Sequence, residues 1–169
     1  SSTGMHTFVL LLLVGLTFTA PSPAPALDDE FAAILRLEDT RTGGAPLRAF
    51  LDVSMPLDVR VRATLAIGRI GSPITTPYDL LGSLSDREPA LRRMAAFALG
   101  EMDDSKAALL LAASLRDTDE AVRALAAEAL GKLKEAASAP SLMTALDDAS
   151  DEVVGHALLA LWKIEPGEL

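Results

Sequence analysis

The chain has 169 residues and a net charge of −9 at pH 7, and half of its residues are apolar although only 4% are aromatic. It contains no cysteine, which excludes disulfide bonds and thiolate metal sites. The acidic balance argues against nucleic acid as a partner, because phosphate backbones bind clustered basic surfaces.

Residues 1–26 are predicted to be a signal peptide or an apolar N-terminal segment. Residues 8–20 read FVLLLLVGLTFTA, a run shorter than the about 20 apolar residues of a spanning helix. Residues 24–26, Ala-Pro-Ala, fit a small-x-small cleavage site, although no Lys or Arg precedes the apolar run. We therefore expect an exported protein, periplasmic or extracellular, without membrane attachment after cleavage. A cytoplasmic location follows if the segment is not a signal.

Residues 27–44 are predicted to form a helix that caps the N-terminal end of the rest of the chain. Within Asp28–Thr40, Phe31, Ile34 and Leu35 recur at helical spacing, and the leading Asp28 suits an N-cap.

The remaining residues, 45–166, contain four similar units, at about 45–72, 73–103, 104–135 and 136–166. Four segments align without gaps, and they read VRVRATLAIGRI, LRRMAAFALGEM, VRALAAEALGKL and VVGHALLALWKI. Two alignment columns, headed by Ala63 and Ala66, are Ala throughout. Three others, headed by Val59, Ile67 and Ile70, are always large and apolar. On a helix these columns form one stripe, as expected of a buried helix face.

Each unit also contains a shorter apolar segment ahead of that helix, followed by a polar linker with acids suited to helix N-termini. These segments are Pro46–Leu51, Pro77–Leu84, Lys106–Leu115 and Ala139–Leu146. Each unit is therefore predicted to be a helical hairpin, which has to stack on its neighbours to bury its apolar face.

The aligned units resemble bacterial HEAT-like repeats, the type also found in phycocyanobilin lyases. That resemblance implies an all-α, right-handed α-solenoid of about four hairpins with an N-terminal capping helix. The family pattern has an Asp after the first helix and an Arg six residues later, and the two form a ladder through the stack. The positions that match are Asp86 with Arg92 and Asp117 with Arg123.

The terminal units depart from this pattern. In the first unit, Ser54 occupies the aspartate position six residues before Arg60. In the fourth unit, Val154 occupies the arginine position six residues after Asp148. The resemblance therefore implies a ladder that is incomplete at both ends.

A search for chemistry yields no catalytic residues, no cofactor site and no metal site. His156 is the only histidine after the predicted signal, and a lone histidine without cysteines cannot build a usual zinc site. Adjacent acids such as Asp147-Asp148 stand at helix starts, where capping explains them.

The resemblance implies that the second helices line a concave surface on which protein partners dock. Phe97 stands in a solvent-facing column that varies between units, and exposed aromatics are favoured at binding hot spots, although packing on the next repeat explains it equally well. Arg62, Arg69 and Arg93 are expected to form a small basic area. The candidate protein-binding residues are Arg62, Arg93, Phe97, Glu128 and His156.

The predicted function is a non-catalytic scaffold for a protein partner. The alternative is the N-terminal repeat module of a longer exported enzyme, such as a cyclophilin-type prolyl isomerase, with a further domain after residue 169. A pigment-lyase-like protein that binds a small ligand is a third interpretation, and DNA binding is disfavoured by charge. Trp162, in a column of glycines, is expected to seal the last repeat or to cover a further one.

Overall fold

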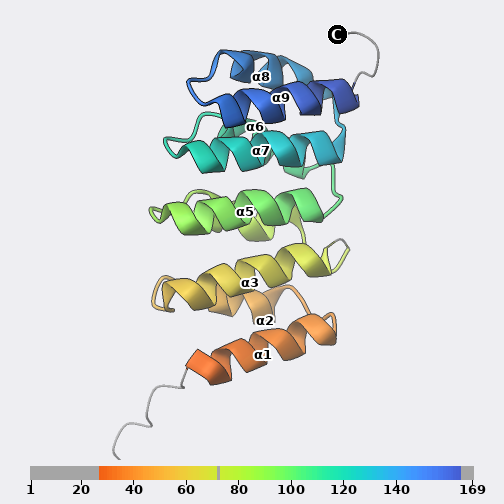
Figure 1. The fold of residues 1–169 in the computed structure, drawn as a ribbon. Coiled ribbons are helices and arrows are strands. Elements are labelled where there is room, and N and C mark those ends of the chain that lie inside the picture. The colour runs from red at the N-terminus through yellow and green to blue at the C-terminus, as the bar shows by residue number, and fades with distance from the viewer. Residues whose placement is uncertain (1–26, 72, 165–169) are drawn as a thin grey trace, which may run out of the picture.

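The computed structural model describes residues 27–71 and 73–164. Every regular element within these residues is a helix, and the helices run back and forth to build an elongated stack (Figure 1). The predicted all-α solenoid is therefore confirmed. The predicted signal segment, residues 1–26, lies outside the described residues.

One layer of the stack holds the second helix of each hairpin together with the N-terminal helix. These helices are α1 (Leu27–Asp39), α3 (Leu57–Ile70), α5 (Pro89–Glu101), α7 (Glu120–Leu133) and α9 (Asp151–Ile164). In the part of the chain that the structure describes, none of the helices is both long and apolar enough to cross a membrane.

The other layer holds the first helices, which are shorter and partly of the 3₁₀ type. Three of them carry a proline in their first turn, namely Pro46, Pro77 and Pro140, where its missing N–H costs nothing. They are α2 (Ala45–Arg48) with η1 (Ala49–Leu51), η2 (Pro77–Leu80) with α4 (Leu81–Leu84), α6 (Ala107–Ser114), and η3 (Ala136–Ser138) with α8 (Ala139–Thr144) and η4 (Ala145–Asp147).

The apolar columns of the second helices form the core. Both alanine columns are almost completely buried, and so are the columns headed by Val59 and Ile67. Small side chains bring neighbouring helices close together, most of all at Gly68. A Cβ on Gly68 would lie 2.6 Å from the Cβ of Ala98 in the next hairpin. The same column holds Gly100 against Ala129 and Gly131 against Ala160.

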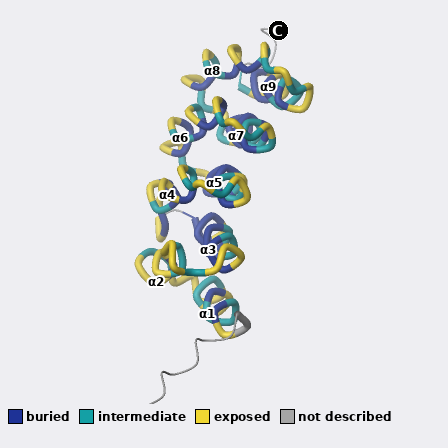
Figure 2. The backbone as a smooth tube through the Cα atoms, turned by 90° about the vertical axis from the view of Figure 1, so that its left-hand side faces the viewer, coloured by how far each residue is buried: buried dark blue, intermediate teal, exposed yellow. Residues whose placement is uncertain are grey.

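The two layers are packed to different densities. The second helices contact one another along their length, whereas open grooves separate the first helices, for example between α4 and α6 at Leu81 and Leu109. The stack therefore bends toward the layer of second helices (Figure 2), which places these helices on the inner, concave side.

Helix α1 packs on the free side of α3 through the fully buried Ile34. Glu38 of α1 pairs with two arginines of α3, and Arg41 donates a hydrogen bond to the carbonyl of Ile70 at 2.6 Å. Because α1 begins at Leu27, Asp28 lies inside the helix, and the prediction that it is the N-cap is wrong.

Candidate functional site

An ion-pair ladder runs along the loops between first and second helices. Arg92 of α5 donates from Nε and Nη2 to the two carboxylate oxygens of Asp117, at 2.7 and 2.9 Å. Arg123 of α7 makes the same two bonds to Asp148, at the same distances. Each arginine thus connects its own hairpin to the next one, in the bidentate geometry that makes arginine–carboxylate pairs strong.

The same guanidinium groups also hold the loop of their own hairpin. Nη1 of Arg92 donates to the backbone carbonyl of Asp86, and Nη1 of Arg123 donates to that of Asp117, both at 2.8 Å. The carboxylates of Asp117 and Asp148 also accept the amide N–H two residues ahead, at 2.8 and 2.9 Å. Each rung therefore fixes two loops at once.

The ladder extends further in both directions than the resemblance implies. Arg60 of α3 pairs with Asp86, and Asp148 pairs with Arg123. The prediction that the ladder is incomplete at both ends is corrected by this pairing, because each arginine pairs with the aspartate of the following hairpin and not with its own. The three rungs that join the four hairpins are Arg60–Asp86, Arg92–Asp117 and Arg123–Asp148.

Hydrogen bonding keeps the ladder ionised. Burial raises the pKa of Asp117, but hydrogen bonds from Arg92 and from the amide of Asp119 outweigh this and hold the pKa below its usual range. The hydrogen bond from Arg123 is the largest cause of the lowered pKa of Asp148.

A further pair, Arg93–Asp119, stands beside the ladder. Arg93 donates from Nε to Asp119 at 2.8 Å, and Asp119 also caps α7 by accepting the amide N–H of Val122 at 3.1 Å. The bond from Arg93 is the main reason that the pKa of Asp119 is about 2.

We expect acid to destabilise the stack through Asp119. Its pKa is about 2 in the folded chain, against about 3.9 for an aspartate in an unfolded chain. A lowered folded pKa contributes stability above the unfolded pKa, and this contribution is lost as the pH falls from about 4 to about 2. Urea unfolding followed by circular dichroism from about pH 6 to about pH 2 measures the loss.

The variant Asp119→Asn should be less stable than the wild type near neutral pH and should lose less stability on acidification. Asp39→Asn, at an exposed carboxylate at the end of α1, is the matched control and should follow the wild type. Equal acid-induced losses in the wild type and in Asp119→Asn would contradict the assignment.

The candidate binding residues all lie on second helices, but the small basic area expected of Arg62, Arg69 and Arg93 is wrong. Glu38 pairs with Arg62 and Arg69, which attaches α1 to α3, and Asp119 pairs with Arg93. Each arginine is therefore engaged in an ion pair within the chain, with the single carboxylate of Glu38 shared by two of them. The sequence pattern does not reveal these partners, because each lies 24 or more residues away.

Phe97 of α5 and Glu128 of α7 meet at Lys132, a residue that the sequence pattern does not single out. The Lys132 ammonium lies 5.3 Å from the centroid of the Phe97 ring, 2.9 Å from a carboxylate oxygen of Glu101 and 3.1 Å from one of Glu128. We call these four residues the Phe97 cluster. Burial lowers the pKa of Lys132, but the bonds to Glu101 and Glu128 outweigh it and raise the pKa above its usual value.

Half-buried apolar side chains lie on the two helices of the Phe97 cluster and on the neighbouring α3. They are Leu65 of α3, Met94 of α5 and Leu125 of α7. His156 continues the column of Met94 and Leu125 on α9, where it is also half-buried. Among the described residues, no three His, Asp or Glu side chains are placed to hold a metal ion.

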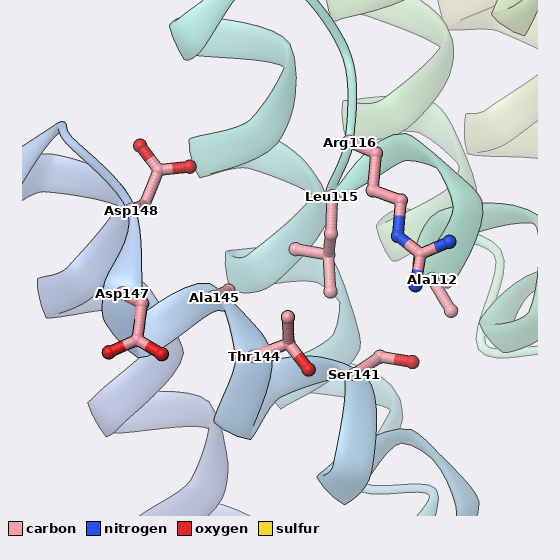
Figure 3. A pocket seen from close by; sticks show the side chains of 8 residues that line it. All are labelled: Ala112, Leu115, Arg116, Ser141, Thr144, Ala145, Asp147 and Asp148. Atoms are coloured by element: carbon pink, nitrogen blue, oxygen red, sulfur yellow. The ribbon is translucent and has the colours of Figure 1, made fainter.

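The first-helix layer holds a groove of about 330 Å³ between α6 and α8 (Figure 3). Arg116 lines one side of the groove and Asp147 the other, with Ser141 and Thr144 between them. Their polar groups do not converge on one point in Figure 3. The groove lies in the layer of first helices, on the convex side of the stack.

Similar folds are found among solved structures. Human deoxyhypusine hydroxylase, solved with glycerol, is 28% identical with a TM-score of 0.63, and the match covers 78% of this chain and 43% of that one. The complex of CpcE and CpcF of phycocyanin lyase from Nostoc sp. PCC7120 is 20% identical with a TM-score of 0.65. This match covers 85% of this chain and 62% of that one. An engineered protein is 20% identical with a TM-score of 0.57, and the match covers 81% of this chain and 73% of that one. The chain thus spans less than two thirds of the two natural proteins.

Sequence comparison gives the family. None of the curated protein sequences matches the chain. The sequence profile of HEAT repeats matches residues 78–162, which is half of the chain. This match runs from η2 to α9 and takes in three stacked hairpins. The chain therefore belongs to the family of HEAT-repeat proteins.

Proposed function

We propose that this chain is a non-catalytic scaffold that binds a protein partner on the concave face of its second helices, around the Phe97 cluster. The position of Phe97 carries the proposal. It is an aromatic side chain, half-buried on the inner face of a solenoid, in a column that holds Leu65, Glu128 and Leu159 elsewhere. Aromatic side chains at the centre of an interface supply much of its binding energy.

The charges near Phe97 support this function. Lys132 already pairs with Glu101 and Glu128, and Arg93 already pairs with Asp119. A partner therefore does not have to neutralise an isolated charge, which would be costly on burial. The ion pairs are suited to the polar rim of an interface whose centre is Phe97 and the neighbouring aliphatic side chains.

The non-catalytic part of the proposal rests on this chain's own residues. The candidate binding residue Arg93, together with Arg62 and Lys132, is engaged in ion pairs that join helices. The human neighbour is a hydroxylase by name, so the shared fold by itself favours neither a catalyst nor a scaffold. The Nostoc neighbour is a complex of two proteins, which is consistent with protein binding.

We also propose that the scaffold acts after export, in the periplasm or outside the cell. The apolar run at residues 8–20 and the Ala-Pro-Ala site at residues 24–26 support this location.

A second candidate function is favoured by the extent of the structural matches. The chain spans 43% of the human hydroxylase chain and 62% of the Nostoc chain, as a repeat module within a longer exported enzyme would. Sequencing the full reading frame decides it. Catalytic sequence after Leu169 would support this candidate, and a stop codon directly after Leu169 would contradict it.

Replacing Phe97 by Ala is expected to reduce partner recovery at least about tenfold, because truncating a hot-spot side chain typically costs about 2 kcal/mol or more. The measurement is affinity capture from periplasmic extract of the source organism, quantified by mass spectrometry. Phe97 is a cleaner probe than Arg93, since changing Arg93 would also weaken the cap of α7.

Tyr78→Ala is the matched control, because Tyr78 is an aromatic residue 60% exposed on the first-helix layer. It should recover partners as the wild type does. If Phe97→Ala and the wild type recover every partner equally, the concave face around Phe97 is not the binding surface.

A further inference from the structure

Two grooves of the first-helix layer are equivalent by the repeat but differ in chemistry. One lies between α4 and α6, and the other lies between α6 and α8 (Figure 3). Nearly every residue that lines the α4–α6 groove stands 31 positions before one that lines the α6–α8 groove, as Ser85 does before Arg116. From the first groove to the second, the lining changes from Leu81 to Ala112, from Ser85 to Arg116, from Leu110 to Ser141 and from Ala113 to Thr144. The α6–α8 groove therefore carries polar groups that stacking of the hairpins does not require.

Two opposite charges stand on the two sides of the α6–α8 groove. Arg116 follows the end of α6, and Asp147 is the last residue of η4 (Figure 3). Both residues are exposed, and neither forms an ion pair within residues 27–71 and 73–164. A simple anion in the groove would meet the carboxylate of Asp147, and a simple cation would meet the guanidinium group of Arg116. The groove is thus suited to a ligand that carries both charges, at opposite ends.

The two hydroxyl groups between these charges match a peptide group. Oγ1 of Thr144 donates to the carbonyl of Pro140 at 3.1 Å, which leaves the oxygen of Thr144 to accept an N–H. The Ser141 hydroxyl makes no hydrogen bond to another described residue, so it is able to donate to a carbonyl. A peptide group supplies one N–H and one carbonyl. The ligand that uses all four polar side chains is therefore a peptide with both termini charged.

We propose that the α6–α8 groove binds a short peptide of two or three residues, with its terminal carboxylate at Arg116 and its terminal ammonium group at Asp147. These two residues hold equivalent positions in successive hairpins, and packed helices lie about 8–10 Å apart. An extended chain spans about 3.4 Å per residue, so two or three residues reach from one charge to the other. The groove volume of about 330 Å³ is at the small end of ligand sites, which suits a peptide of this size.

This site is independent of the proposed protein-binding surface. The α6–α8 groove belongs to the convex layer of first helices, whereas the Phe97 cluster lies on the second helices. A failure of one proposal therefore leaves the other standing.

The test is a titration of the ¹⁵N-labelled full chain with trialanine, followed by two-dimensional NMR spectroscopy. The amide signals of Arg116, Ser141 and Thr144 should shift together and saturate with a dissociation constant of about 1 mM, because the groove is open to solvent and exposed ion pairs are weak. Trialanine amide lacks the carboxylate and acetyl-trialanine lacks the ammonium group, so each should bind about fivefold more weakly. Free alanine, which is too short to reach both charges, should also bind more weakly.

Matched substitutions assign each charge to its end of the peptide. Arg116→Ser introduces the residue type that Ser85 supplies in the α4–α6 groove, and it should remove the preference for trialanine over trialanine amide. Asp147→Asn should remove the preference for trialanine over acetyl-trialanine. Arg87→Ser, at an arginine side chain that is 84% exposed in the preceding hairpin, is the control and should bind all three peptides as the wild type does.

Circular dichroism verifies that each variant is folded. The proposal would be overturned by the absence of saturable shifts in the α6–α8 groove up to about 10 mM trialanine. Equal binding of trialanine and both blocked peptides would also overturn it. So would an Arg116→Ser variant that still prefers a free carboxylate, or an Asp147→Asn variant that still prefers a free ammonium group.

Discussion

Leucine in place of Gly68 is expected to destabilise the stack by about 3 kcal/mol, the upper end of the usual cost of overpacking. A Cβ at this position would lie 2.6 Å from the Cβ of Ala98 and 2.8 Å from its Cα and its carbonyl oxygen. Because two of these atoms belong to the backbone of α5, α3 and α5 have to separate. Urea unfolding followed by circular dichroism measures the change in the free energy of unfolding.

Gly155→Leu is the matched control for this overpacking. Gly155 also lies inside a second helix, α9, but a Cβ on it would meet no atom within 4 Å. Replacing glycine by leucine there should stabilise the helix by about 0.5–1 kcal/mol. Should Gly68→Leu prove as stable as the wild type, the close contact between α3 and α5 cannot be as described.

The second large effect is expected from the middle rung of the ladder. Arg92→Met should cost about 2 kcal/mol, because it leaves Asp117 without its bidentate partner and two carbonyl oxygens without their donor. A lysine at this position should restore less than half of the loss, since an ammonium group cannot make the same fork of bonds. Urea unfolding of both variants gives these values.

A double-mutant cycle with Asp117→Asn isolates the ion pair from the rest of the arginine's contacts. We expect a coupling energy of about 1–2 kcal/mol between the two residues, since charged hydrogen bonds contribute about this much. Arg87→Met is the control, because the Arg87 side chain is 84% exposed and its loss should stay within about 0.5 kcal/mol. A coupling energy near zero would show that the rung is not a stabilising element.

The ladder also marks a limit of what this sequence alone can predict. An arginine that stands six residues after its own aspartate stands 25 residues before the next one. In a tandem repeat both spacings recur together, so the sequence pattern cannot tell which pair is in contact. The stacked hairpins decide it, because the side chains of Arg92 and Arg123 reach across to the following loop.

The Phe97 cluster shows the same limit at the candidate binding face. Glu101 and Lys132 lie 31 residues apart and on different helices, and nothing in either local segment indicates that they meet. In the sequence, Arg62 and Arg93 resemble free basic groups for an equivalent reason, since Glu38 and Asp119 come from other elements. Such contacts depend on the angle and spacing between stacked helices.

The sequence by itself determined the helices and the side of each second helix that is buried. Alanine columns such as that of Ala63, together with the large apolar columns, recur at the period of a helix, and burying that stripe is the main source of stability. Only the tertiary structure decided which charged groups pair across the stack, and that Leu158 and Trp162 of α9 are exposed. The physical reason is that apolar burial depends on a periodicity within one helix, whereas an ion pair or an exposed end depends on which hairpin lies next to it.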